Sequence, residues 1–259
     1  MPYPTFFKTV LCAAFVIVPG VAAADCEAMF AETGKPTHST GGGNNIELCR
    51  LGYFVSFDPE TKVPDWVQER IDTAQLTGSA KRSPKFKPDP GLPKGDGPTL
   101  ADYKGSGYDR GHQAPAGDMV WSQQAKDQSF YLSNMAPQVG VGFNRGVWAA
   151  LETQIRAWVK DGRSRLVVAT GPVYGHQQHT IGTGKVVVPM QFYKVVYDPK
   201  NNRAIGFLLS NAAVDDRNDY KNRVVAIDAI ETLTGLDFLT KLSEAEQEKL
   251  ESTAAELWE

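Results

Sequence analysis

Cysteine is scarce in this chain of 259 residues, and so are long apolar runs. Only three cysteines occur, and Cys12 lies within the first 24 residues, which leaves Cys26 and Cys49. Two cysteines are too few for a cysteine-based zinc cluster. Beyond the N-terminal segment, no stretch approaches the roughly 20 apolar residues of a membrane-spanning helix. Because repeats and linkers are also missing, we predict a single domain over residues 25–259.

The first 24 residues have the pattern of a secretory signal peptide. One lysine precedes an apolar run over 9–18, Pro19-Gly20 interrupts it, and small residues follow up to Ala24. Such residues typically precede a signal-peptidase cleavage site. The run is short for the alternative, an uncleaved membrane anchor. We therefore predict a periplasmic or secreted protein, cleaved near Ala24 and without membrane contact afterwards.

Cys26 and Cys49 flank a loop rich in glycine and asparagine. In an oxidising compartment such a pair commonly forms a disulfide, which here would fasten the N-terminal arm to the first predicted strand. Two unpaired thiols are the alternative, which is less common in a secreted chain. The sequence therefore predicts a disulfide between Cys26 and Cys49.

The chain also lacks an excess of positive charge, since its formal net charge is −3. This value argues at first sight against a nucleic-acid binder, but the distribution of charge changes the interpretation. Residues 241–259, which include an acidic helix predicted at about 243–257, carry two lysines against six glutamates. Residues 76–94 carry five basic side chains against Asp89 alone. This basic segment suits a polyanion, although solvated lysines are the commoner explanation of such a run.

The most informative segment is DRGHQAPAGDM at 109–119. Arg110 lies two residues before His112, and the pair suits phosphate chemistry, because a guanidinium binds the anion and an imidazole moves a proton. Gly111 between them indicates a sharp turn or a close approach of the backbone to another group. Taken alone, such a segment is more often a polar turn around a hydrogen-bonded histidine.

A helix predicted over 143–159 carries a stripe of polar residues. Asn144, Glu152 and Arg156 are separated by multiples of four, so they share one face of the helix. Each has an ordinary explanation, Asn144 as a helix cap and Glu152–Arg156 as a helix ion pair. Together with His112, however, they would form an oxygen-rich metal site beside a base and phosphate-binding arginines.

The sequence resembles the DNA/RNA non-specific endonucleases, which are the ββα-metal or His-Me finger nucleases. DRGH at 109–112, YLSNMAPQ at 131–138 and FNRGVWAALE at 143–152 carry the resemblance, which covers roughly residues 45–240. It implies a metal-dependent, sugar-non-specific endonuclease that cuts DNA and RNA without reading their sequence and leaves 5′-phosphates. The alternatives are a secreted polyanion-binding protein that kept this fold without its chemistry, and a phosphodiesterase for smaller or lipid-linked substrates.

The resemblance also implies a role for each site residue. His112 corresponds to the general base, Asn144 to the direct metal ligand, and Glu152 to the acidic residue that holds the water shell of the metal. The expected cation is Mg²⁺, with Mn²⁺ as the other candidate, because both accept oxygen ligands. The residues expected to bind phosphate or stabilise its charge are Arg82, Lys85, Arg110 and Arg156. Many relatives are homodimers, but the sequence identifies no interface, and it shows no inhibitor partner.

The hydrophobic pattern predicts a mixed α+β fold with a largely antiparallel central sheet, and the resemblance adds a ββα-metal motif. Strands are predicted at 52–57, 130–133, 166–170, 185–197 and 204–210. Helices are predicted from about residue 64 and at 143–159, 220–233 and 243–257. Residues 77–104 are predicted to form a long surface loop. His176 and His179 are assigned to a polar loop rather than a zinc site, and the acidic run 215–219 to a loop before a helix.

Overall fold

The computed structural model describes residues 25–39, 43–81, 85–163 and 165–258. The predicted signal peptide at 1–24 and the predicted phosphate-binding Arg82 lie outside these described residues. Within the described ranges, no helix combines the length and the apolar character that crossing a membrane requires.

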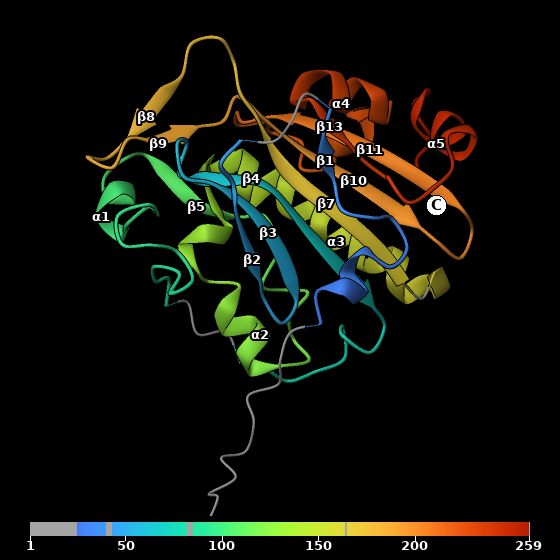
Figure 1. Cartoon of the computed structure of the whole chain (residues 1–259), viewed down its shortest axis with the longest axis horizontal. Helices are drawn as coiled ribbons and strands as arrows, with labels where there is room; N and C mark the ends of the chain where they lie inside the picture. Colours follow the sequence, from blue (N-terminus) through green and yellow to red (C-terminus); the bar gives the residue numbers. More distant parts are fainter. Residues whose placement is uncertain (1–24, 40–42, 82–84, 164, 259) are drawn as a thin grey trace, which may run out of the picture.

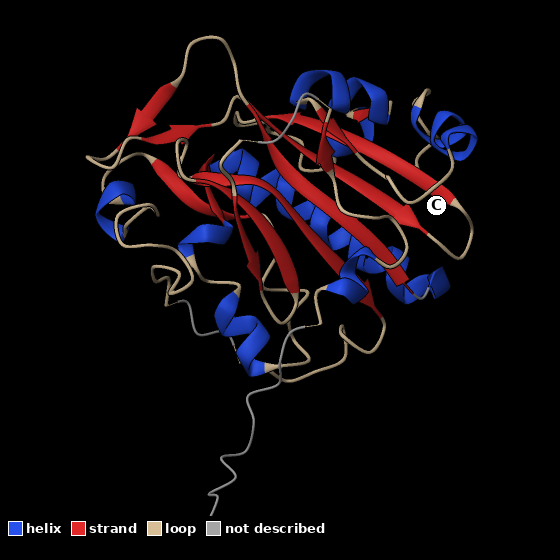
Figure 2. Cartoon of the chain, viewed as in Figure 1, coloured by secondary structure: helices blue, strands red, loops and turns tan. Residues whose placement is uncertain are grey.

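A seven-stranded antiparallel sheet forms the centre of the protein, and its strands cross the middle of Figure 2. From edge to edge the order is β12-β11-β10-β7-β4-β3-β2 (Figure 1). The bounds are β2 (Ile46–Cys49), β3 (Tyr53–Asp58), β4 (Val63–Asp72), β7 (Arg165–Val173), β10 (Gln191–Asp198), β11 (Arg203–Ser210) and β12 (Val224–Val225). Every neighbouring pair is antiparallel, which confirms the predicted fold class.

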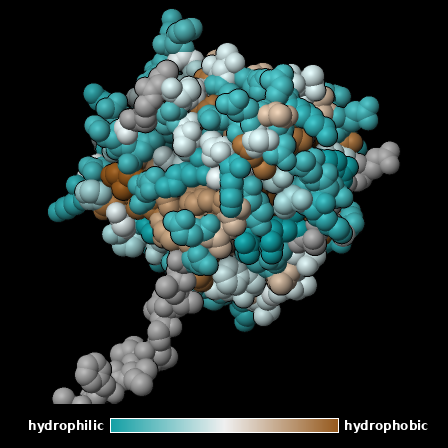
Figure 3. Space-filling model, turned by 45° about the vertical axis from the view of Figure 1, so that its right-hand side comes forward, coloured by the Kyte–Doolittle hydropathy of each residue, from teal (hydrophilic) through white to brown (hydrophobic). Residues whose placement is uncertain are grey.

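Helices cover both faces of this sheet. On one face α3 (Trp148–Trp158) shares a core with Val168 of β7. On the other face α4 (Ile227–Thr234) shares a second core with Val167, the preceding residue of the same strand. Consecutive strand residues point to opposite faces, so one apolar strand supplies both cores. The surface in Figure 3 is accordingly mostly hydrophilic, with apolar residues in small areas.

Three two-stranded sheets lie around the centre among the described residues. They pair β5 (Tyr108–His112) with β6 (Met135–Val139), β8 (His179–Ile181) with β9 (Val186–Val188), and β1 (Thr37–His38) with β13 (Leu236–Asp237). The remaining helices are α1 (Leu100–Tyr103), α2 (Gln123–Gln128) and α5 (Glu244–Glu251), with 3₁₀ turns at Glu27–Phe30, Leu132–Asn134 and Asp219–Asn222. An irregular helical segment, Gly140–Val147, leads into α3.

Three predicted strands are confirmed, because 52–57, 166–170 and 204–210 correspond to β3, β7 and β11. The strand predicted at 185–197 is instead two strands, β9 and β10. Pro189 lies between them, and a proline has no N–H for continuing a ladder of backbone hydrogen bonds.

The helix predicted from residue 64 is wrong, because this segment is β4, a central strand. Trp66, Val67 and Ile71 recur at helical spacing, which suggested one apolar face. A strand covered on both faces needs apolar residues on both, however, and these three side chains are all buried. The spacing therefore reflects a two-sided strand.

Other predicted elements change in extent. The strand predicted at 130–133 is a 3₁₀ turn followed by β6. The helix predicted at 220–233 begins only at Ile227, because Val224–Val225 pair with β11 as a short strand. The terminal acidic helix ends at Glu251 rather than 257. Helix α3 begins at Trp148, since Gly142 and Gly146 adopt backbone angles outside the helical region.

The predicted disulfide between Cys26 and Cys49 is confirmed, with the two Cα atoms 5.9 Å apart. It joins the 3₁₀ turn at Glu27–Phe30 to β2. The sequence did not predict β2, so the disulfide reaches the sheet one strand earlier than expected. It fastens the N-terminal arm to the edge of the central sheet.

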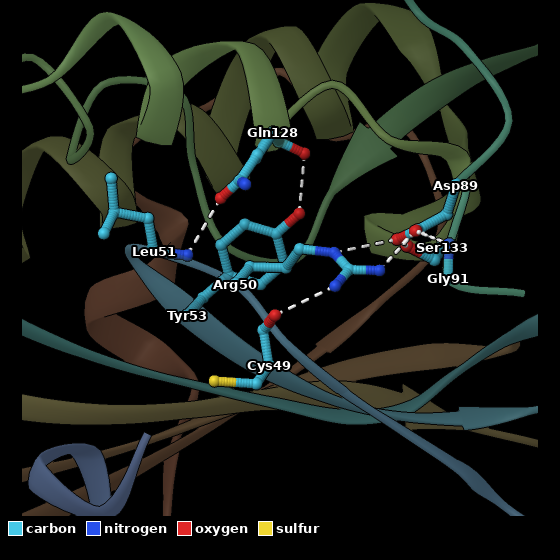
Figure 4. A network of polar contacts seen from close by, with 8 residues as sticks. All are labelled: Cys49, Arg50, Leu51, Tyr53, Asp89, Gly91, Gln128 and Ser133. Atoms are coloured by element: carbon cyan, nitrogen blue, oxygen red, sulfur yellow. Dashed lines mark hydrogen bonds and ion pairs between the residues drawn. The ribbon is translucent and has the colours of Figure 1, made fainter. Parts of the chain in front are cut away.

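The segment 77–104 is mostly loop, as predicted, and a buried ion pair anchors it (Figure 4). The carboxylate of Asp89 pairs with Arg50 and accepts hydrogen bonds from the Ser133 hydroxyl and the Gly91 N–H. The acidic residue of the basic segment is thus neutralised inside the protein. Among the described residues of the basic segment 76–94, the exposed charged side chains are those of Lys81, Lys85, Lys87 and Lys94.

Candidate active site

Two short strands and a helix bring the predicted site residues together. In β5, His112 lies opposite Met135 of β6, and the chain then continues through the irregular segment into α3. Asn144 lies in the irregular segment, and Glu152 and Arg156 lie on α3. This order, two antiparallel strands followed by a helix, is the arrangement expected of a ββα motif.

The site residues line one open cleft of about 440 Å³. Its walls include Arg110 and His112 from β5, Asn144 from the irregular segment, and Glu152 and Arg156 from α3. Of the other predicted residues, Lys85 is exposed and adjoins Phe86, which itself lines the cleft. Five residues that the sequence singled out over 47 positions, from 110 to 156, therefore face the same space.

Asp109 orients the amide of Asn144. The Asn144 Nδ2 donates a hydrogen bond of 2.9 Å to Asp109 Oδ2, and Arg145 Nε lies 3.0 Å from the same oxygen. Because this contact uses the amide nitrogen, the amide oxygen of Asn144 is the atom left to bind a ligand in the cleft. An amide oxygen and the nearby Glu152 carboxylate are donors that a hard divalent cation prefers, so the residues present fit such an ion.

His112 is held by aromatic neighbours and by the backbone that follows it. Its ring centre lies 4.9 Å from that of Phe130, edge to face, and 5.7 Å from that of Phe86. The Arg110 guanidinium lies over the Phe86 ring, with its Cζ 4.4 Å from the ring centre. Beyond His112, the Asn134 side chain accepts from the Ala114 N–H and donates to the Ala114 carbonyl. The imidazole thus sits in a fixed, partly apolar wall.

Gly111 shows why the motif requires glycine. A Cβ built at this position would lie 2.1 Å from the side chain of Gln138 on β6, too close for any other residue without a shift. The expected close approach is therefore confirmed, and Gln138 of the neighbouring strand is its cause.

Burial makes the Glu152 carboxyl unusual. Burial raises the pKa of Glu152 to about 7, the nearby Lys194 and Arg156 oppose the rise, and Asp118 adds to it. Arg156 pairs with Asp118, Nη1 to Oδ1 at 2.9 Å, instead of forming the helix ion pair with Glu152 that its spacing suggested. Arg156 also donates to the Thr153 hydroxyl at 3.1 Å, so its guanidinium is fixed at the cleft wall.

Lys194 and Glu69 extend this charge cluster beneath the cleft. Lys194 is 1% exposed, donates to the Thr170 hydroxyl at 2.8 Å, and lies 4.9 Å from the Trp148 ring centre. Burial lowers the pKa of Lys194, whereas Glu152, Glu69 and Asp118 raise it. Burial likewise raises the pKa of Glu69 well above its ordinary value. Three carboxyl groups and two cations therefore share a largely buried region next to the site.

Sequence reasoning missed the roles of Asp109, Glu69 and Lys194. Asp109 was within the DRGH segment but had no partner until the fold brought Asn144 to it. Lys194 lies among apolar residues in the middle of β10, whereas Glu69 lies on β4 between Gln68 and Arg70. An isolated charge in an apolar run is the signal that would have found Lys194, because such a charge is rarely buried without a partner. The sequence around Glu69 carries no such signal.

A profile of the DNA/RNA non-specific endonucleases matches residues 31–245. The chain belongs to this family. It is 42% identical over 210 residues to nuclease C1 of Cunninghamella echinulata var. echinulata, covering 75% of this chain and 83% of that protein. It is 33% identical over 207 residues to human mitochondrial endonuclease G, covering 74% and 69%.

The fold is similar to that in a crystal structure of the EndoG/EndoGI complex. The TM-score is 0.76 with 30% sequence identity, over 87% of this chain and 96% of that chain. The predicted family is thus confirmed, and the protein is a nuclease, a phosphodiester hydrolase. The family is one of divalent-metal-dependent nucleases, and the donor set of the cleft agrees with that requirement.

The same comparisons correct the predicted location. Relatives from Schizosaccharomyces pombe, Saccharomyces cerevisiae, Caenorhabditis elegans, cattle and human are named mitochondrial nucleases. The prediction of a periplasmic or secreted protein is therefore wrong. It rested on the composition of the first 24 residues, and a short apolar N-terminal run followed by small residues does not by itself identify a compartment.

Proposed function

We propose that the cleft hydrolyses internal phosphodiester bonds of DNA and RNA without reading their sequence, with His112 as the general base. The observation that carries this proposal is the shared cleft, where His112, Asn144, Glu152 and two arginines converge from separate elements. The proposal treats residues 25–259 as one nuclease domain.

His112 takes the proton of the attacking water. Imidazole is the side chain that ordinarily exchanges a proton near neutral pH. His112 lines the cleft, so its ring can accept a proton directly from a water molecule bound there. The aromatic wall of Phe86 and Phe130 limits the orientations of the ring. A fixed base contributes about 10²–10⁴-fold to a rate.

Asn144 and Glu152 would hold the cation, Asn144 through its amide oxygen and Glu152 through water. We propose Mg²⁺, with Mn²⁺ as a substitute, because both accept oxygen ligands and retain several waters. When bound, the ion supplies stabilisation of charge on the phosphate and on the departing 3′-oxygen. Asp109 fixes the amide of Asn144 for this role.

Arg110 and Arg156 bind the phosphate group and stabilise its additional negative charge during the reaction. Asp118 holds Arg156 in the cleft wall. Lys85, which adjoins the cleft residue Phe86, and the other exposed lysines of the basic segment attract the polyanion through its backbone. We assign Arg82 to the same phosphate-binding group. Contacts to phosphate carry no information about bases, so cleavage is independent of sequence, and we expect 5′-phosphate products.

Digestion of supercoiled plasmid tests the proposal. The protein is incubated with plasmid and Mg²⁺, with EDTA in place of Mg²⁺, and as the variants His112→Ala and His176→Ala. His176 is exposed in a loop outside the cleft and serves as the matched control. We expect nicking that requires Mg²⁺, persists in His176→Ala and falls at least about 100-fold in His112→Ala. A folded His112→Ala protein that cuts at the normal rate would refute the assignment of the base.

A further inference from the structure

A group of three carboxylates lies away from the cleft, where α4 meets α5. Asp228 and Glu231 are one turn apart on α4, and Glu251 is the last residue of α5. One carboxylate oxygen of each lies within 4.8 Å of the others. Figure 1 shows the two helices on the side of the central sheet opposite α3.

Glu251 is buried without a partner. Its side chain is 3% exposed, and its Oε1 is buried and has no hydrogen-bond partner among the described residues. Over the same residues, none of the three carboxylates forms an ion pair with a lysine, arginine or histidine. A buried carboxylate without a cation or a donor is costly, so some positive group is expected to complete this arrangement.

The surroundings increase this negative charge. Asp237 of β13 adds a fourth carboxylate nearby, and the pKa of Glu251 is raised to about 8 by burial and then by Glu231, Asp228 and Asp237. One oxygen of Glu231 accepts the Phe238 N–H at 2.8 Å, which orients that carboxylate. The acidic groups that act on Glu251 thus come from both α4 and β13.

We propose that Asp228, Glu231 and Glu251 bind a divalent cation of the calcium type, at a site separate from the catalytic cleft. Ca²⁺ takes six to eight oxygen ligands at about 2.3–2.6 Å, so opposite ligands lie about 4.6–5.2 Å apart. Three oxygens within 4.8 Å of one another can share such an ion. Asp228 and Glu231 are half-buried, which leaves room for water to complete the coordination.

The site would stabilise the C-terminal part of the fold. Helix α5 contacts both α4 and β11, and β13 pairs with β1 near the N-terminal arm. A cation between Glu251 and α4 would therefore connect the end of α5 to the helix that covers the second face of the sheet. Ions that bind only the folded state raise its stability in proportion to the logarithm of their concentration.

Thermal unfolding of the full chain tests the proposal, with CaCl₂ or with EDTA. Asn144→Ala removes the proposed ligand of the cleft, Glu251→Gln removes the proposed ligand of the new site, and Glu248→Gln alters an exposed glutamate of the same helix as a control. At about 100 times the dissociation constant, we expect Ca²⁺ to raise Tm on the order of 5–10 °C. This shift should persist in Asn144→Ala and Glu248→Gln and disappear in Glu251→Gln.

Calorimetric titration of CaCl₂ into the Asn144→Ala protein provides the second measurement. We expect one binding event that Glu251→Gln, introduced into the same background, abolishes. An equal Tm shift in Glu251→Gln would overturn the proposal. So would the absence of a Tm shift in the wild-type protein together with no binding event in the Asn144→Ala titration, which would mean that a proton shared between carboxyl groups, rather than a metal ion, occupies this position.

Discussion

The carboxylates beneath the cleft and those between α4 and α5 lie on opposite faces of one sheet, and they differ in what balances their charge. Around the cleft, Glu69, Asp118 and Glu152 have Lys194 and Arg156 among them. Between α4 and α5, burial raises the pKa of Glu251, the neighbouring acidic groups raise it further, and no cation of the described residues opposes the rise. Among the described residues, the protein thus balances one group of buried acids with its own cations and provides no cation for the other.

The cleft therefore has positive charge built into the fold, whereas the carboxylates between α4 and α5 would need a bound ion to supply it. In the cleft, Lys194 and Arg156 oppose the rise in the pKa of Glu152, so part of the positive charge is built into the fold. Their positions are fixed by hydrogen bonds to Thr170, Asp118 and Thr153. A pre-arranged set of charges of this kind favours catalysis because it need not reorganise during the reaction.

The largest effect is expected from removing the internal cation. Lys194→Met leaves Glu69, Asp118 and Glu152 with Arg156 as the remaining balancing charge. Removing one partner of a buried charge network typically costs about 3–5 kcal/mol, so we expect a loss of this size in the free energy of unfolding, measured in urea. Adding Glu69→Gln should recover much of the loss, because it removes one of the unbalanced carboxylates. A stability of Lys194→Met within about 1 kcal/mol of the wild type would contradict this description.

A smaller effect should come from Asp109→Asn, which disturbs the orientation of Asn144 without touching the cluster of buried charges. Residues that orient a metal ligand typically change metal affinity or activity by about 10–100-fold. We therefore expect the Mg²⁺ concentration for half-maximal plasmid cleavage to rise by that factor. Asp161→Asn, at an exposed position after α3, is the matched control and should leave it unchanged. An unchanged Mg²⁺ requirement in Asp109→Asn would count against the proposed orienting role.

The smallest effect is expected from Glu251→Gln, between α4 and α5, and it should stabilise the protein rather than destabilise it. The pKa of Glu251 lies at about 8 in the folded protein, above its ordinary value of 4.5. The folded state therefore holds a proton there that the unfolded state has released, and stability falls as pH rises from about 5 to 8. In EDTA, Glu251→Gln should remove this dependence and raise Tm by a few degrees at pH 9, and less at pH 6. A Glu251→Gln protein less stable than the wild type at pH 9 would contradict the view that this charge is unbalanced.

The local motifs predicted residues that the fold brings into one cleft, because these residues lie within short segments whose chemistry can be interpreted residue by residue. His112 could be named as a candidate from DRGH, and Asn144 and Glu152 from their spacing along the helix predicted over 143–159. Glu69 and Lys194 could not, because their role depends on β4 and β10 bringing them beneath a helix from another part of the chain. Their partners are set by strand order, which no local pattern contains.

The fold shows the same limit. Strands β3, β7 and β11 were predicted from their apolar content, but β4 was mistaken for a helix because burial on both faces removes the alternation of a half-exposed strand. The Cys26–Cys49 disulfide was predicted correctly, although the compartment inferred along with it was wrong. The pairing of two cysteines depends on the fold alone, whereas the location of a protein depends on how the cell recognises its targeting sequence.

The most direct test of the central claim is chemical rescue of His112→Ala by free imidazole in the plasmid assay. Without His112 the cleft keeps its proposed metal ligands and arginines, and imidazole can supply the missing proton acceptor. We predict that imidazole restores part of the Mg²⁺-dependent cleavage in His112→Ala and none in Asn144→Ala. Cleavage by His112→Ala at the wild-type rate without imidazole, or equal rescue of both variants, would contradict the assignment of His112 as the base.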